Sequence, residues 1–338
     1  MTGTPPASPL RIAVIGCGGI ANREHYAALA SFPEVEIVGA CDLDPRCLHD
    51  TADRWGIEGR YSNYRAMIEA EAPDAVYVVL RPHHLYDPAA WCLQQGLHLF
   101  MEKPPGITAY QTRSLAQIAE RNECLTMVAL NRRYSPLLNA ARDLVLSRGP
   151  MTSVVCGGYV AHGDKPGYYD GAVNVLHCHG VHYLDTLRWL AGDVKQIASQ
   201  VRSSERDFET GWFALTRHEG GCSGTVMLNW QAGGARPYDF EMHGRGISIF
   251  VSLTGRWRVL VEGEEDPEAL AQFTSAPQDN RLSHYGFREE NRHFIDCLLE
   301  GRQPLTNLAD ATKSMELADL LLAAARPARS VGRIEGEI

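Results

Sequence analysis

The first part of the chain alternates apolar runs of strand length with stretches of helical periodicity. The apolar runs cover residues 10–15, 35–41, 75–80, 97–101 and 125–130, and helical patterns cover 47–55, 64–71, 88–95 and 108–121. Continuous apolar runs are typical of strands that are buried on both faces of a parallel sheet. The alternation predicts an α/β domain with a doubly wound parallel sheet over residues 1–131, in which residues 1–9 form a loose tail.

The pattern changes after residue 131. Strand-like stretches follow at 152–160, 194–201, 208–217, 222–231, 238–243, 247–253 and 257–262, with helical patterns at 136–147, 174–190, 283–300 and 308–325 and an acidic solvated loop at 262–268. Short glycine turns at 219–221 and 244–246 are hairpin signals. We therefore predict an α+β second domain over 132–338 with a large, mainly antiparallel open sheet. Its uncovered face is expected to form a homodimer or homotetramer.

The first apolar run ends in a glycine-rich turn that precedes a helical pattern. This turn contains Gly16, Gly18, Gly19, Ile20 and Ala21. Such a turn lets the backbone approach a pyrophosphate and places the helix N-terminus against it. The next strand ends at Asp42, roughly 20 residues further on, where a carboxylate binds the ribose hydroxyls of a dinucleotide. The sequence thus predicts a Rossmann domain that binds NAD rather than NADP, with Arg46 as the residue that would favour NADP.

Composition narrows the possible partners and location. Of 338 residues, 45% are hydrophobic and 22% are charged, which suits a two-domain globular protein. The net charge of −9 argues against binding to nucleic acid. No apolar run approaches the about 20 residues that span a bilayer, and the N-terminus lacks a signal-peptide core. Nine scattered cysteines without a Cys-x-x-Cys pair indicate reduced thiols, so we expect a cytoplasmic protein.

Candidate chemistry follows two of the predicted parallel strands. Ligands of such sheets bind at the carboxyl ends of strands. The run 75–80 ends at Leu80-Arg81-Pro82, and the run 97–101 is followed by Glu102 and Lys103. We expect both turns to border the cofactor and Lys103 to hydrogen-bond the reacting oxygen during hydride transfer. The alternative for Lys103 is a salt bridge to Glu102 at a strand end.

The helix predicted over 174–190 carries a second candidate catalytic group. At 100° per residue, Cys178, His182 and Asp185 fall on the side opposite the apolar stripe. His182 would then supply or relay a proton, and Asp185 would orient its ring. The alternative is a histidine satisfied by a neighbour. A metal site of His179, His182 and Asp185 is not favoured, because hydride transfer needs no metal, and we expect none.

The substrate contacts are the least specific part of the prediction. The loop 162–170 mixes aromatic and polar residues, which suits a sugar ring, although it equally fits an ordinary solvated loop. We assign Arg132, Tyr168, Cys178, His179 and Tyr285 as substrate contacts. Arg132 and Arg133 follow the last parallel strand, and the alternative is that they pair with acids between the domains.

These motifs occur in an order that resembles one known family. The turn 16–21, the Glu102-Lys103-Pro104 motif, the Asn131-Arg132-Arg133-Tyr134 segment and His182-Tyr183-Leu184-Asp185 are similar to those of the glucose–fructose oxidoreductase and inositol 2-dehydrogenase (Gfo/Idh/MocA) family. The resemblance implies NAD(P)-dependent oxidation or reduction of sugars, cyclitols or related carbonyl compounds. It also implies a catalytic lysine at 103, a histidine at 182, and Asn131 at the junction beside the cofactor.

Three positions depart from the pattern that the resemblance implies. Cys178 stands where many members have an acid or asparagine, Arg81 where many have a small polar residue, and Tyr86 where histidine is common. We therefore predict an NAD-dependent oxidoreductase for a polyhydroxylated ring compound, and two alternatives stay open. One is an enzyme that retains NAD through an internal redox cycle, as in some glycosidases of the family. The other is a sensor that binds the dinucleotide without turnover.

Overall fold

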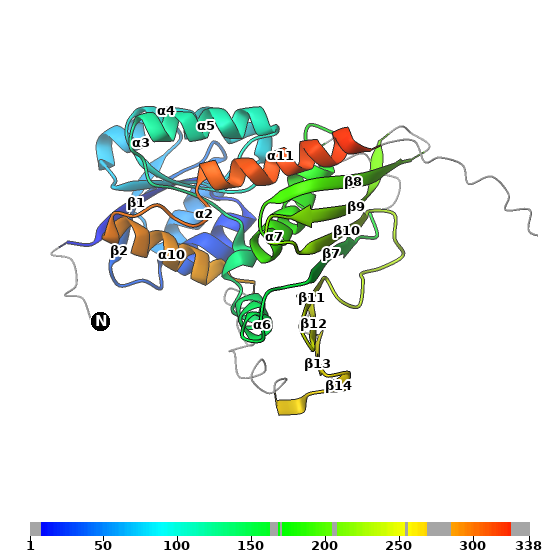
Figure 1. Ribbon diagram of the computed structural model, residues 1–338. Coiled ribbons are helices and arrows are strands. Elements are labelled where there is room, and N and C mark those ends of the chain that lie inside the picture. The colour runs from blue at the N-terminus through cyan, green and yellow to red at the C-terminus, as the bar shows by residue number, and fades with distance from the viewer. Residues whose placement is uncertain are drawn as a thin grey trace, which may run out of the picture.

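The computed structural model describes residues 8–162, 168–169, 171–204, 208–253, 256–268 and 285–325. Two sheets lie beside each other in the fold (Figure 1). The first is a six-stranded parallel sheet in the order β3-β2-β1-β4-β5-β6. Its strands are β1 (Leu10–Ile15), β2 (Val35–Cys41), β3 (Gly59–Tyr61), β4 (Ala75–Val78), β5 (His98–Met101) and β6 (Thr126–Val128). The strand order reverses between β1 and β4, which is where doubly wound sheets bind their ligands.

Helices cover both faces of this sheet. They are η1 (Ala21–Tyr26), α1 (Ala27–Leu29), α2 (Pro45–Trp55), α3 (Tyr64–Glu71), η2 (Pro82–His84), α4 (Tyr86–Gln94) and α5 (Ala109–Arg121). Side chains that favour N-caps begin three of them: Asp44 caps α2, Asn63 caps α3 and Thr108 caps α5. The predicted doubly wound parallel sheet is confirmed.

The second sheet has eight strands in the order β14-β13-β12-β11-β7-β10-β9-β8. They are β7 (Ser153–Tyr159), β8 (Val194–Ser203), β9 (Glu209–His218), β10 (Ser223–Asn229), β11 (Phe240–Gly244), β12 (Ile247–Ser252), β13 (Arg256–Val261) and β14 (Glu264–Glu265). Every pair is antiparallel except β7 with β10. The mainly antiparallel sheet is confirmed, and the predicted acidic loop contains the short strand β14.

One face of the second sheet is covered by helices. These are α6 (Pro136–Leu146), α7 (Val181–Ala191) and the second half of α11 (Leu308–Ala324). Trp212 and Phe240 of the sheet are fully buried with Leu184 and Leu187 of α7 in this core. On the opposite face Leu215 is 65% exposed.

The last two helices return to the first sheet. Phe294 and Ile295 of α10 (Phe287–Glu300) belong to the same buried cluster as Tyr77 and Phe100. Helix α11 begins with Leu308, Ala311 and Met315 in the core of the first sheet and continues with Leu317, Ala318 and Leu321 in the core of the second. Figure 1 shows this helix spanning both halves. Helices α10 and α11, which the sequence places in the second domain, therefore also pack against the first sheet.

Candidate active site

The glycine turn after β1 leaves open space at the switch point of the sheet. Gly16 has φ +115°, and a Cβ there would lie 2.1 Å from the Val79 carbonyl oxygen, so only glycine fits. A Cβ on Gly18 or Gly19 would meet no heavy atom within 4 Å. Helix η1 begins directly after this turn, at Ala21. The turn thus has room for a pyrophosphate beside free backbone amides, as a bound dinucleotide requires.

Asp42 holds the turn from the end of β2. Its Oδ2 accepts a hydrogen bond of 2.8 Å from the Cys17 amide, and its Oδ1 accepts one of 2.9 Å from the Asp44 amide. Each oxygen keeps a second lone pair for a ribose hydroxyl. Arg46 does not point at Asp42 as a charge partner, since its Nε lies 3.9 Å from Asp50.

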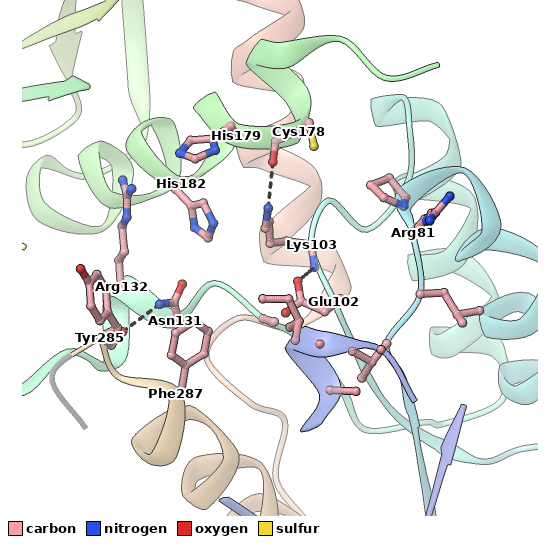
Figure 2. A pocket seen from close by; sticks show the side chains of 18 of the residues that line it. Arg81, Glu102, Lys103, Asn131, Arg132, Cys178, His179, His182, Tyr285 and Phe287 are labelled. Atoms are coloured by element: carbon pink, nitrogen blue, oxygen red, sulfur yellow. Dashed lines mark hydrogen bonds between the residues drawn. The ribbon is translucent and has the colours of Figure 1, made fainter. Parts of the chain in front are cut away.

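A cleft of about 620 Å³ extends from the glycine turn to the second sheet. Figure 2 shows that its walls come from both halves of the protein. Most predicted site residues line it: Gly18, Gly19, Ile20, Ala21, Leu80, Arg81, Pro82, Glu102, Lys103, Asn131, Arg132, Cys178, His179, His182 and Tyr285. The predicted residues Gly16, Asp42, Tyr168 and Asp185 are not part of this wall.

Glu102 and Lys103 lie at the carboxyl end of β5, at the floor of the cleft. The Glu102 Oε1 lies 3.2 Å from His25 Nε2, and its Oε2 accepts a 2.9 Å hydrogen bond from the Lys103 amide. Burial opposes the Glu102 charge, but His25 and Lys103 outweigh burial and lower the pKa of this carboxyl. The Lys103 ammonium instead donates a 3.1 Å hydrogen bond to the Cys178 carbonyl oxygen in the opposite wall.

The opposite wall contributes two histidines. The chain forms a π-helical turn, η4 (Leu176–Gly180), before α7 begins. His182 Nδ1 is buried and has no hydrogen-bond partner within the described part of the chain. Burial, then the charges of Lys103 and Arg132, lower the pKa of His182 well below its usual range and that of His179 to about 3. Both rings are therefore neutral at physiological pH.

The prediction that Asp185 orients the His182 ring is wrong. Asp185 is 1% exposed and points between helices, where its carboxylate accepts hydrogen bonds from Arg133 and from the Ser314 hydroxyl. His182 and Asp185 are three residues apart in α7, so their side chains diverge by about 60°, and Arg133 and Ser314 lie on the Asp185 side. With Asp185 committed to Arg133, the alternative metal set of His179, His182 and Asp185 does not assemble among the described residues.

The aromatic residues of the predicted loop 162–170 differ in part from the prediction. The Tyr168 hydroxyl lies 3.2 Å from His179 Nδ1, so Tyr168 contacts the histidine ring without lining the cleft. Tyr169 lines the cleft instead. The remainder of the predicted loop, residues 163–167 and 170, lies outside the described residues.

Five further lining residues were not assigned individually: Val79, Ala129, Tyr169, Leu253 and Phe287. Tyr169 belongs to the predicted aromatic loop 162–170, whereas no local motif singles out the other four. Phe287 and Tyr285 flank Gly286, which has φ +82° and whose Cβ would lie 2.4 Å from the Asn131 carbonyl oxygen. The side-chain amide of Asn131 donates a 2.8 Å hydrogen bond to the Tyr285 carbonyl oxygen. This close approach holds the start of α10 against the cleft.

The fold and this cleft define an oxidoreductase with a dinucleotide-binding Rossmann domain. Residues 10–130 match the oxidoreductase family with an NAD-binding Rossmann fold, and residues 154–250 match the Gfo/Idh/MocA C-terminal domain. The chain belongs to the Gfo/Idh/MocA family, as the resemblance implied. The Rossmann domain is therefore NAD(P)-binding.

Relatives match along almost the whole chain. D-apiose dehydrogenase of Paraburkholderia graminis is 27% identical over 340 residues, which cover 94% of this chain and 88% of that protein. The scyllo-inositol 2-dehydrogenase (NAD(+)) of Bacillus subtilis is 22% identical, with 91% and 92% covered. The structure of levoglucosan dehydrogenase in complex with NADH and levoglucosan has a TM-score of 0.80 at 20% identity and covers 94% of this chain and 97% of that one.

Hydropathy gives a separate finding. Within the ranges that the structure describes, none of the helices combines the length and the apolar character needed to cross a lipid bilayer.

Proposed function

We propose that the protein is an NAD-dependent dehydrogenase that oxidises a secondary alcohol of a sugar or a related polyhydroxylated ring, or reduces the matching ketone. The observation that carries the proposal is that Lys103, His182 and the open glycine turn line one cleft. The named activities of the relatives, on D-apiose and on scyllo-inositol, support the substrate class.

The residues around the turn fit the cofactor. The open backbone at Gly18 and Gly19 would hold the pyrophosphate, and Asp42 would accept hydrogen bonds from the adenosine ribose. A carboxylate at this position repels a 2′-phosphate, which favours NAD over NADP. The nicotinamide, when bound, accepts a hydride from the alcohol carbon or returns it to the ketone.

Lys103 and His182 have different roles at the substrate oxygen: one stabilises its charge and the other accepts its proton. The Lys103 ammonium, which donates a hydrogen bond to the Cys178 carbonyl oxygen, turns to donate to the reacting oxygen and stabilises its developing negative charge. The neutral His182 ring has a free Nδ1, so it accepts the hydroxyl proton during oxidation and passes it to solvent. One C–H bond and one O–H bond break, and a C=O bond forms.

The test is steady-state turnover of Lys103→Met and His182→Asn, with NADH affinity measured separately by fluorescence. Each variant should lose about 10²–10⁴-fold in kcat while binding NADH as the wild type does. Lys313→Met is the matched control, because Lys313 is an exposed lysine paired with Asp193 and should keep full activity.

The released cofactor separates this proposal from the alternatives. Net oxidation releases NADH into solution, an internal redox cycle gives product without released NADH, and a sensor gives neither. Undiminished turnover of Lys103→Met would remove the proposed role of the lysine.

A further inference from the structure

The cleft carries more positive than negative charge. Among the described residues that line it, Arg81, Lys103 and Arg132 are cationic, and Glu102 is the single acid. Glu102 is already committed to His25 and to the Lys103 amide. The Lys103 ammonium is held by a carbonyl oxygen rather than by a carboxylate. The described walls of the cleft therefore carry unbalanced positive charge.

Arg132 is a buried cation that has no counter-ion among the described residues. It is 8% exposed, and its guanidinium carbon lies 4.0 Å from the centroid of the Tyr183 ring and 5.4 Å from that of Phe240. Its Nη1 is buried, and no described residue forms a hydrogen bond with it. The neighbouring Arg133 is buried to a similar degree, but it contacts the carboxylates of Asp185 and Asp310.

A buried guanidinium without an anion is unfavourable, and stacking on aromatic rings compensates for only part of the lost hydration. A planar guanidinium binds a carboxylate through two parallel hydrogen bonds, and this interaction strengthens when water is excluded. A ligand that supplies a carboxylate at Arg132 would remove the imbalance.

Arg132 lines the same cleft as Lys103 and His182. In Figure 2 the His182 ring lies between the Arg132 guanidinium and the Lys103 ammonium. The charges of both cations lower the pKa of His179 and of His182, so both cations lie near these rings. A ring compound with its reacting hydroxyl at Lys103 can therefore direct another substituent to Arg132.

We propose that the substrate is a sugar acid, and that Arg132 binds its carboxylate while Lys103 holds the hydroxyl that is oxidised. This inference rests on the proposed dehydrogenase function. The carboxylate itself takes no part in the redox step. A carboxylate fits better than a phosphate, because Leu253 and Tyr285, two of the described residues that line the cleft, offer a dianion no second cation.

The test compares binding of matched ligands to the NADH-loaded protein by calorimetry. The pairs are D-glucuronate with D-glucose and D-galacturonate with D-galactose, and glucose 6-phosphate is the phosphate probe. The acids should bind about ten- to hundredfold more tightly than their neutral partners. Arg132→Gln should remove this preference without changing NADH affinity, and Arg132→Lys should restore only part of it.

Arg142→Gln is the matched control. Arg142 also stacks on an aromatic ring, with its guanidinium carbon 4.7 Å from the Trp189 centroid, but it pairs with Asp143 outside the cleft. This variant should keep the preference for acids. The melting temperature gives a second readout, because Arg132→Gln removes an uncompensated cation and should leave the ligand-free protein at least as stable as the wild type.

The outcomes separate this inference from the proposed function. Equal affinity for acids and neutral sugars, tighter binding of the phosphate ester, or no binding of any acid overturns the inference. If a neutral sugar is then oxidised with release of NADH, the dehydrogenase function stands alone. If the acids bind through Arg132 but no ligand is oxidised, the anion site stands and the proposed function fails.

Discussion

Replacing Asp185 by alanine tests whether this carboxylate joins the two halves of the protein or takes part in catalysis. Asp185 lies on α7, and its partners are Arg133 in η3 (Asn131–Tyr134) and Ser314 in α11. Arg133 Nη2 also lies 2.7 Å from Asp310 Oδ2. Burial opposes the charge of Arg133, but Asp185 and Asp310 outweigh it and raise the pKa of the guanidinium. Three segments that are distant in sequence thus meet at one buried ion pair.

The structure sets the size of the effect. The side chains of Arg133 and Asp185 are 8% and 2% exposed, and removing one partner of such a pair leaves a buried charge without its main counter-ion. This typically costs 3–5 kcal/mol, and we expect about 3 kcal/mol because Asp310 remains beside Arg133. Asp185→Asn keeps the shape and one acceptor, so its cost should be lower, about 1–3 kcal/mol.

The assay is thermal unfolding combined with turnover of the folded protein. With an unfolding entropy of about 0.7 kcal/mol per kelvin for a chain of this length, Asp185→Ala should lower Tm by roughly 4 °C. Below the unfolding transition its kcat should stay within about tenfold of the wild type, since loss of a proton-transfer group would cost about 10²–10⁴. Asp50→Asn is the control, because its 3.9 Å pair with Arg46 is exposed and should not affect Tm.

Two results would refute this reasoning. An unchanged Tm would mean that the buried pair contributes nothing to joining the halves. A large loss of kcat together with a shifted pH profile in Asp185→Asn would mean that Asp185 acts on His182 after all.

Three further predictions concern the cofactor, the histidines and the exposed sheet. Asp42→Ala should lower the preference for NAD over NADP by about 10–100-fold in kcat/KM, because it loses the ribose contacts and the repulsion of a 2′-phosphate; an unchanged ratio would contradict the assignment. Since the pKa of His179 in the folded protein is about 3, below its unfolded value of about 6.5, the unfolded state binds the proton first and stability falls as pH falls between these values. When pH is lowered from 6.5 to 5, the free energy of unfolding in urea titrations should therefore decrease by about 2 kcal/mol less for His179→Gln than for the wild type. Equal decreases would contradict this pKa. We expect the wild type to sediment as a dimer or tetramer and Leu215→Glu to sediment as a smaller species, because Leu215 is 65% exposed on the uncovered face of the second sheet; a wild-type monomer would contradict the expectation.

The regular parts of the fold were predictable because each depends on local periodicity. The continuous apolar run at Ala75–Val78 became a strand that is fully buried on both faces, and Thr108 became the N-cap of α5. The glycine turn and the position of Asp42 also follow from short-range spacing. The open space at Gly18 could be anticipated for the same reason.

The features that the sequence did not predict depend on long-range packing. The parallel pairing of β7 with β10 joins strands that are separated by two others in the chain. The return of α10 and α11 to the first sheet is invisible to periodicity, which shows that a helix has an apolar face but not which surface covers it. The partners of Asp185, which are Arg133 and Ser314, are equally invisible to a helical projection because both are distant in sequence.

The adjacent arginines show how one short segment serves both halves. Sequence alone leaves open whether Arg132 and Arg133 bind substrate or pair with acids, and the structure assigns one arginine to the cleft and the other to the acids. They lie in a 3₁₀ turn, in which successive side chains diverge by about 120°. Arg133 therefore reaches the carboxylates of α7 and α11, and Arg132 reaches the rings of Tyr183 and Phe240 beside the cleft. Because the first pair fixes the turn, it also fixes where the unpaired guanidinium lies relative to Lys103. Loss of Asp185 should consequently weaken the affinity for an acidic ligand more than it lowers the rate of hydride transfer.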